Sequence, residues 1–248
     1  MDQPTPAPTQ FTLRRLMLVV LACSMFLAVI VGVVRAQRES SRASECINNS
    51  KQIGLGLRVY HDVFDQFPAA YLSDAQGQPL HSWRPVIIPY SESTGGLTIR
   101  FQDFEKAWND PANLAISNRV RPHYYYCPSD EHSAKTGGVN KVMVAGVETA
   151  APGALGRHIA DFRDGAANTI FVAEIADSDI HWTEPRDLEF DKMSFRINDP
   201  SLPSISGHHS EGAAVMMADG SVRFLSNDTD PSVVRALLTV AGGERAQP

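Results

Sequence analysis

The longest regular pattern in the chain joins an uncharged run to an amphipathic stretch. Residues 16–34 contain no charged side chain. Between residues 35 and 67, small and apolar side chains return every three or four positions, which places them on one face of a helix. This face consists of Ala43, Cys46, Ile47, Ser50, Ile53, Gly54, Leu57, Tyr60, His61 and Phe64. No proline interrupts either segment, so we expect one continuous helix whose second half carries a globular domain.

The uncharged run predicts a single membrane crossing. Its 19 residues would span roughly 28 Å as a helix, close to the hydrocarbon thickness of a bilayer. A cleaved signal peptide is the alternative, although its apolar core is usually only ~7–15 residues long. Arginines flank both ends of the run, so charge does not decide the orientation, and the short N-terminal tail favours a cytoplasmic N-terminus.

The expected organisation therefore has three parts. Residues 1–15 form a disordered tail, residues 16–34 a transmembrane helix in contact with the lipid bilayer, and residues 35–245 one extracytoplasmic, periplasmic domain. The proline-rich start of the tail argues against a helix there.

Alternation beyond residue 211 predicts a β-hairpin. Apolar residues occupy every second position on both sides of Asp219-Gly220, namely Ala213, Val215, Met217, Val222 and Phe224. Asp-Gly is typical of a two-residue type I′ turn, in which both residues adopt positive φ.

Two further strands and one helix follow from local sequence. Residues 140–147 and 170–175 are apolar or β-branched runs bounded by turn residues, which predicts strands. A helix is expected from Pro231, with Asp228 or Asp230 as its N-cap. Residues 69–130 are rich in Pro, Gly, Trp and Tyr without a clear period and predict ordered loops.

The predicted fold class is α+β, with the long amphipathic helix packed on an antiparallel sheet and an irregular, loop-rich middle. The helix stripe that contains Ile53 and Leu57 is expected to cover Val215 and Met217 of the hairpin. The helix glycines at 54 and 56 would allow a close approach to the sheet.

Charge and motif content argue against two function classes. The chain carries a net charge of −6, whereas nucleic-acid binding depends on clustered Lys and Arg. The sequence contains no HExxH motif, paired CxxC, Gly-rich phosphate loop or G-x-S-x-G motif. We therefore expect no nucleic-acid partner, no cofactor and no enzymatic activity.

Several polar and aromatic residues still allow alternatives. His208, His209 and Asp219 lie close in sequence and could form a metal-dependent hydrolase site, which His61-Asp62 could approach. The simpler interpretation is a hydrogen bond from His209 to nearby backbone, with Glu174 as a buried partner of an Arg or of backbone amides. The aromatic residues could stack on a ligand, although packing is the commoner role; they are Trp83, Trp108, Tyr124, Tyr125 and Tyr126.

The N-terminal sequence resembles the start of a type IV prepilin, but imperfectly. Phe11-Thr12-Leu13 precedes the apolar run, as in prepilins. Gln10 stands where a prepilin has glycine, and Arg15 stands where it has glutamate. We therefore expect neither peptidase cleavage nor the usual filament contact.

Ordered motifs across the remaining chain resemble the family called domain of unknown function fifteen fifty-nine. Its members are pilin-like proteins with an H-x9-DG signature, abundant in planctomycetes and also described as a solute-binding group. The matching family positions are Cys46, Tyr60, His61, Asp62, Pro68, Trp83, Cys127, Pro128, Asp130, Asp164, Gly165, Asn168, Thr169, Glu174, His209, Asp219 and Gly220.

The resemblance implies a membrane-anchored, pilin-like cell-envelope protein, similar to subunits of type II secretion systems. Its role would be structural or would involve an envelope protein partner. An extracytoplasmic module that binds a small solute or a glycan is the alternative, and the hydrolase described above is a second alternative. The sequence names no ligand.

Two of the three cysteines are candidates for a disulfide. Cys23 lies in the membrane run, whereas Cys46 and Cys127 both fall in the expected extracytoplasmic domain. An oxidising compartment favours pairing. A bridge closing a loop of about 80 residues would contribute roughly 4 kcal/mol. Two separate buried thiols are the alternative.

Overall fold

The computed structural model describes residues 13–91, 103–209 and 211–243 of the chain. The chain divides into two compact units, Met1–Ser41 and Arg42–Pro248. Residues 1–12, which include most of the expected tail and the prepilin-like Phe11, lie outside the described residues. The predicted continuous helix is confirmed as α1 (Leu13–Phe64). It ends three residues earlier than expected because Asp65 adopts a left-handed φ of 55°.

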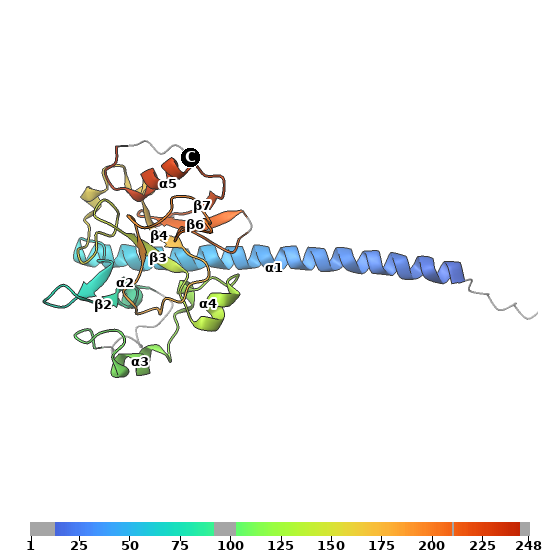
Figure 1. Ribbon diagram of the computed structural model, residues 1–248, viewed down its shortest axis with the longest axis horizontal. Coiled ribbons are helices and arrows are strands. Elements are labelled where there is room, and N and C mark those ends of the chain that lie inside the picture. Colours follow the sequence, from blue (N-terminus) through green and yellow to red (C-terminus); the bar gives the residue numbers. More distant parts are fainter. Residues whose placement is uncertain (1–12, 92–102, 210, 244–248) are drawn as a thin grey trace, which may run out of the picture. The chain divides into compact units, whose positions relative to one another are not determined.

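The remaining elements belong to the second unit (Figure 1). Its shorter helices are α2 (Trp83–Ile87), α3 (Pro111–Ser117), α4 (Glu131–Thr136) and α5 (Pro231–Leu238). Single 3-10 turns occur at Ile88–Tyr90, His123–Tyr125, Ile159–Asp161 and Ala166–Asn168. The strands are β1 (Tyr71–Ser73), β2 (Pro79–Ser82), β3 (Lys141–Ala145), β4 (Ile170–Glu174), β5 (Leu188–Glu189), β6 (Gly212–Met217) and β7 (Val222–Ser226).

A five-stranded sheet forms the centre of this unit, in the order β5-β3-β4-β6-β7. Neighbouring strands from β3 to β7 pair antiparallel, whereas β5 pairs with β3 in parallel. The expected α+β class and the strands predicted around residues 140–147 and 170–175 are confirmed. The sheet is mixed rather than purely antiparallel because the two-residue β5 joins its edge. A separate two-stranded sheet consists of β1 and β2.

The second half of α1 packs on the sheet as predicted, but through a different set of strand residues. A Cβ added at Gly54 would lie 3.0 Å from Met216 Sδ and 3.3 Å from the Gly220 carbonyl. Met216 therefore faces the helix, and Val215 and Met217 point to the opposite face of β6. All six residues of β6 are buried, since both faces of this strand are covered. The expectation that Val215 and Met217 lie under α1 is wrong.

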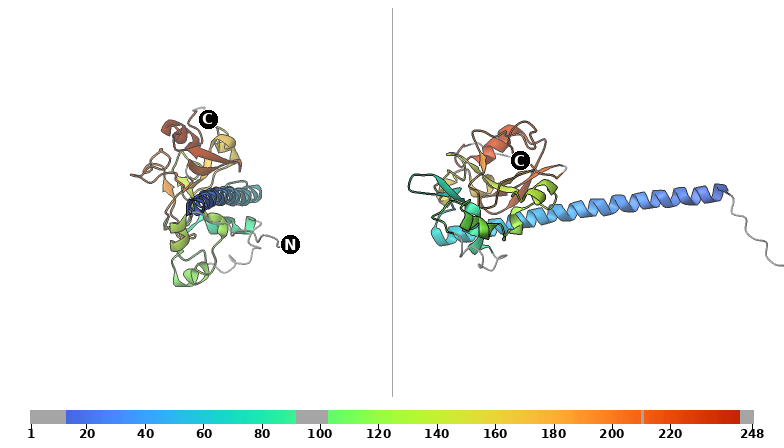
Figure 2. Two further views of the ribbon diagram at one scale, coloured as in Figure 1. Left: turned by 90° about the vertical axis from the view of Figure 1, so that its right-hand side faces the viewer. Right: turned by 60° about the horizontal axis from the view of Figure 1, so that its bottom comes forward.

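The elements of this unit lie on two sides of residues 42–64 of α1. Helix α5 lies with β6 and β7 on one side of this helix segment, and α3 lies on the other side (Figures 1 and 2). Helix α5 begins at Pro231 with Asp230 as its N-cap, as predicted, since the Asp230 carboxylate accepts a hydrogen bond from the Ser232 amide. Its residues Val234, Leu237 and Leu238 are buried.

The predicted hairpin is confirmed, but its turn is not of type I′. Among the described residues, the non-glycine residues with positive φ are Asp65, Asp177 and Asn198, so Asp219 does not share the φ of +86° at Gly220. The Gly220 amide donates to the Met217 carbonyl and the Met217 amide donates to the Ser221 carbonyl. This is the three-residue loop in which a type I turn is followed by a left-handed residue.

We expect Gly220→Ala to lower the free energy of unfolding by about 1–2 kcal/mol, the cost of a left-handed conformation for a residue with a Cβ. Apart from Gly220 itself and its two chain neighbours, no heavy atom of the described residues lies within 4 Å of a Cβ built at this position, so the cost comes from the backbone conformation. Urea unfolding of the detergent-solubilised chain, followed by tryptophan fluorescence, measures the change. Gly220→Asn is the matched control, because Asn tolerates this conformation better. Equal losses in both variants would contradict the explanation.

Candidate functional site

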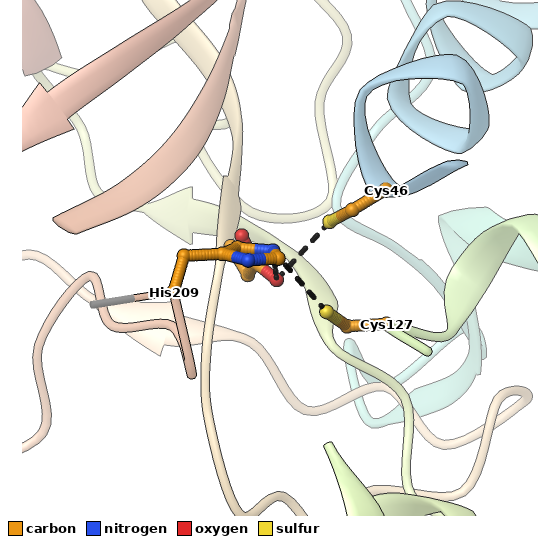
Figure 3. A group of neighbouring side chains, drawn as sticks. Cys46, Cys127 and His209 are labelled. Carbon is orange, nitrogen blue, oxygen red and sulfur yellow. Dashed lines mark hydrogen bonds and ion pairs between the residues drawn. The ribbon is translucent and has the colours of Figure 1, made fainter. Parts of the chain in front are cut away.

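Five polar side chains from separate segments meet inside the second unit, and we call them the buried polar cluster. Cys46 comes from α1, Cys127 from the loop after the His123–Tyr125 turn, Lys141 from the start of β3, Glu174 from the end of β4 and His209 from the segment before β6. Each is between 0 and 8% exposed. Figure 3 shows the side chains of Cys46, Cys127 and His209 pointing toward one another.

Local structure explains why these residues meet. Lys141 and Glu174 are direct partners in the antiparallel register of β3 and β4. The Cys127 amide donates to the Asn140 side chain at 2.8 Å, which holds the Cys127 loop beside the start of β3. His209 forms a bridge with Gly212, the first residue of β6. The cluster is thus assembled by sheet register and loop anchoring together.

The distances within the cluster are short. Cys46 Sγ lies 3.2 Å from Glu174 Oε1 and 3.0 Å from Lys141 Nζ. Lys141 Nζ is 3.7 Å from Glu174 Oε1. His209 Nε2 is 3.6 Å from Cys127 Sγ and 4.0 Å from Glu174 Oε1. The second oxygen of Glu174 accepts a hydrogen bond from the Ala214 amide at 3.1 Å.

Mutual contact shifts the pKa values of these groups in opposite directions. A hydrogen bond from Cys127, together with the positive charge of Lys141, lowers the pKa of Cys46, while the same hydrogen bond and burial raise the pKa of Cys127. Burial opposes the charge on Lys141, but the Glu174 carboxylate and the Cys46 sulfur outweigh it and raise the lysine pKa. Burial raises the pKa of Glu174. The Lys141 ammonium, 3.0 Å from Cys46 Sγ, thus stabilises the thiolate form of Cys46 relative to its thiol form.

The two cysteines of the predicted disulfide are both in this cluster. Their sulfur atoms lie within 4.8 Å of each other, and both residues are free cysteines in the structure. The pairing of Cys46 with Cys127 stays a prediction. Because the two sulfurs lie this close, they are placed either to form a disulfide or to bind one metal ion together.

His209 contacts the side chains of Cys127 and Glu174, and its predicted hydrogen bond to nearby backbone stays a prediction. For Glu174, the expected backbone amide is found in Ala214, but its charged partner is Lys141 rather than an arginine. The prediction of Glu174 as a buried partner of backbone amides is thus confirmed, whereas its contact with Lys141 depends on strands far apart in the chain.

A second group, formed by Asp130, Asp177 and His208, is more exposed. His208 Nε2 lies 3.0 Å from Asp177 Oδ1 and 3.6 Å from Asp130 Oδ1. Asp130 is the N-cap of α4 and also accepts hydrogen bonds from Asn140 and the Asp177 amide. Burial opposes ionisation of Asp130, but the hydrogen bonds that it accepts outweigh burial and lower its pKa. A cavity of about 430 Å³ is lined by Asp177 and His208.

The structure does not bring together the residues of the suggested hydrolase site. His209 precedes β6 and Asp219 follows it, and a six-residue strand is about 20 Å long. His208 points to the Asp177 carboxylate instead. His61 lies 15 residues beyond Cys46 on α1, or about 22 Å along the helix axis. His61-Asp62 therefore does not approach His209, which lies beside Cys46, and its possible approach to Asp219 stays a prediction.

The remaining family positions serve local structure. The Asp164 carboxylate accepts hydrogen bonds from the amides of Gly242 and Gly243, which fastens the C-terminal segment. Asn168 and Thr169 donate to the carbonyls of Asp164 and Gly165, and Asp219 accepts from Ser221. Three others pack against neighbouring residues: Tyr60 is half-buried against Tyr90, Pro68 is buried and Pro128 is half-buried.

The aromatic residues of the middle segment are mostly core. Trp83, Tyr124 and Tyr125 are fully buried, so the predicted packing role is confirmed for these three. Trp83 also donates from its indole to Asp187 at 3.3 Å. Trp108 stacks on His181, and Tyr126 lies under Arg121. A continuous stacking surface for a ligand is not formed by these residues.

Comparison with known proteins identifies a family and nothing more specific. The family model described as "Protein of unknown function (DUF1559)" matches residues 35–159 and 181–232, well over half of the chain. No curated protein matches the chain, and no solved structure matches it.

Proposed function

The chain belongs to the DUF1559 family of proteins of unknown function, and from this premise we propose that it is a single-pass cell-envelope protein. Its domain would stand on the extracytoplasmic side and act as a structural or interaction module rather than as an enzyme. The observation that carries the proposal is α1, a single helix whose first part has the length and composition of a membrane span and whose second part is core.

The two parts of α1 differ in what surrounds them. The most apolar stretch of the helix is not covered by any other part of the described chain. Such a surface suits contact with lipid rather than with protein. Further along, Cys46, Ile53 and Leu57 of the same helix are fully buried in the domain.

We expect the full chain to remain in the membrane fraction after alkaline carbonate washing, and Leu21→Arg with Ala28→Arg to release it. Each arginine near the middle of a span opposes insertion by about 2.5–3.5 kcal/mol. Val63→Arg is the matched control, because Val63 is an exposed apolar residue of α1 in the domain. Release of the wild-type chain, or an intact mass lacking the apolar run, would contradict anchoring and favour a cleaved signal sequence.

Protease treatment of spheroplasts tests the orientation. A domain on the extracytoplasmic side is degraded before the inner membrane is broken. Protection of the domain in intact spheroplasts would overturn the proposed orientation while leaving the anchor in place.

A second candidate, a solute-binding or glycan-binding module, has one supporting observation. The cavity of about 430 Å³ beside His208 is lined by several polar groups, including Asp177, Asn198, Asp199 and Ser206. Its volume falls within the range of small-molecule sites. Thermal-shift screening of the solubilised chain against sugars and oligosaccharides tests this candidate, with His208→Ala as the variant expected to lose any shift.

A further inference from the structure

The buried polar cluster contains four side chains that can serve as metal ligands. Cys46, Cys127, Glu174 and His209 each offer one donor atom, and these four atoms all lie within 4.8 Å of one another. In a tetrahedral zinc site with bonds of about 2.0–2.3 Å, neighbouring ligand atoms are roughly 3.3–3.8 Å apart. The cluster distances of 3.2, 3.6 and 4.0 Å are close to this spacing.

The charges of the cluster also match a divalent cation. Lys141 supplies one positive charge, and Cys46, Cys127 and Glu174 can supply three negative charges. A zinc ion together with Lys141 balances these three anions, which removes the large cost of an uncompensated charge in a buried site. Two thiolates and one imidazole are also a donor set typical of tetrahedral zinc rather than of magnesium or calcium.

Neighbouring groups orient the donor atoms. The Ala214 amide binds Oε2 of Glu174, so Oε1 is the oxygen left facing Cys46 and His209. Lys141 Nζ approaches Cys46 Sγ at 3.0 Å, where it stabilises the thiolate. Such outer contacts are a usual part of metal sites because they fix the direction of each ligand.

We propose that Cys46, Cys127, Glu174 and His209 bind one zinc ion. Four protein ligands leave no open position, so the ion is structural, and it joins α1, the loop before α4, the end of β4 and the segment before β6. As zinc binds, thiol protons are released to solvent and no electron is transferred. The proposal concerns the folded domain and does not rest on the proposed membrane role.

Zinc binding and the predicted disulfide exclude each other. A disulfide places the two sulfurs about 2.05 Å apart and removes both as thiolate ligands. Zinc instead keeps Cys46 and Cys127 reduced at ligand spacing. Whether Cys46 and Cys127 are reduced or oxidised therefore decides between the zinc site and the disulfide.

Metal analysis of the full chain tests the proposal. The chain is purified in detergent through a tag without histidines, and its zinc content is measured by mass spectrometry. We expect one zinc per chain in the wild type and at least a tenfold lower content in Cys127→Ser and His209→Ala. Cys23→Ser and His208→Ala are the matched controls, since neither residue belongs to the cluster, and both are expected to keep the zinc.

A second measurement does not depend on whether the ligand variants fold. In the Cys23→Ser chain, titration with a mercurial thiol reagent is expected to release all zinc, detected by a chromogenic chelator, after two equivalents. Cobalt substitution is expected to give the intense absorption of thiolate-bound cobalt. Absence of zinc at isolation and after reconstitution, a Cys46–Cys127 disulfide in its place, or zinc retained in a Cys46→Ser/Cys127→Ser chain would each overturn the proposal.

Discussion

Replacing Asp187 by alanine is expected to lower the free energy of unfolding of the domain by about 3–5 kcal/mol, the usual cost of leaving a buried charge without its partner. Asp187 Oδ1 lies 2.7 Å from Arg84 Nη2, and the two side chains are 4% and 0% exposed. The same oxygen accepts hydrogen bonds from the Met143 amide and the Trp83 indole. Alanine would leave all three donors unsatisfied in the core.

The remaining contacts of Arg84 cannot compensate for this loss. Its guanidinium also donates to the Lys141 carbonyl and to Ser82 Oγ, so the group is held in place and cannot turn to solvent. Urea unfolding of the solubilised chain by tryptophan fluorescence measures the effect. Glu189→Ala is the matched control two residues away, because its ion pair with Lys192 is largely exposed and should be worth less than about 1 kcal/mol. Similar decreases in the free energy of unfolding for Asp187→Ala and Glu189→Ala would contradict the conclusion that the buried Asp187–Arg84 pair stabilises the domain.

Lys141→Met is expected to cost a similar amount, about 3–5 kcal/mol, measured with reductant and a chelator present. Methionine fills much of the volume of the lysine stem but leaves the Glu174 carboxylate and the Cys46 sulfur without a cation. Lys135→Met serves as the control, since Lys135 is an exposed residue of α4 and should change stability by less than about 0.5 kcal/mol.

A double-mutant cycle separates the charge from the packing of Lys141. In a Glu174→Gln background the buried carboxylate is gone, so Lys141→Met should cost less there by at least about 1 kcal/mol. If the two losses simply add, the lysine stabilises the domain through its stem and the electrostatic explanation is wrong.

Elements with a local signal could be predicted from the sequence. The uncharged run and the stripe that follows it gave α1 as one helix, alternation around Asp219-Gly220 gave the β6–β7 hairpin, and Asp230-Pro231 gave the start of α5. Each of these signals lies within a few residues of the element that it predicts. The face of a strand that contacts a helix depends on tertiary structure instead. Both faces of β6 are buried, so alternation alone could not show that Met216, rather than Val215 and Met217, faces α1.

The candidate site was predicted only in fragments. Cys46, Cys127, Glu174 and His209 were singled out by family motifs, but nothing in their spacing indicates that they meet. Lys141 was missed because a lysine at the start of a strand usually reaches solvent, and its partner Glu174 lies 33 positions away in the register of two strands. Such register is fixed by the whole sheet, so the local sequence carries no signal for it.

The order of the cluster residues along the chain has a consequence during synthesis. Cys46 lies near the start of the domain, whereas His209 emerges roughly 160 residues later, which takes about 8–30 s at ordinary translation rates of ~5–20 residues per second. Since β6 and β7 also come late in the domain, the nascent domain cannot close around Cys46 before these two strands have been made. A cysteine that ends in the core must therefore wait as an accessible thiol, open to oxidants and to wrong partners, until the last strands arrive.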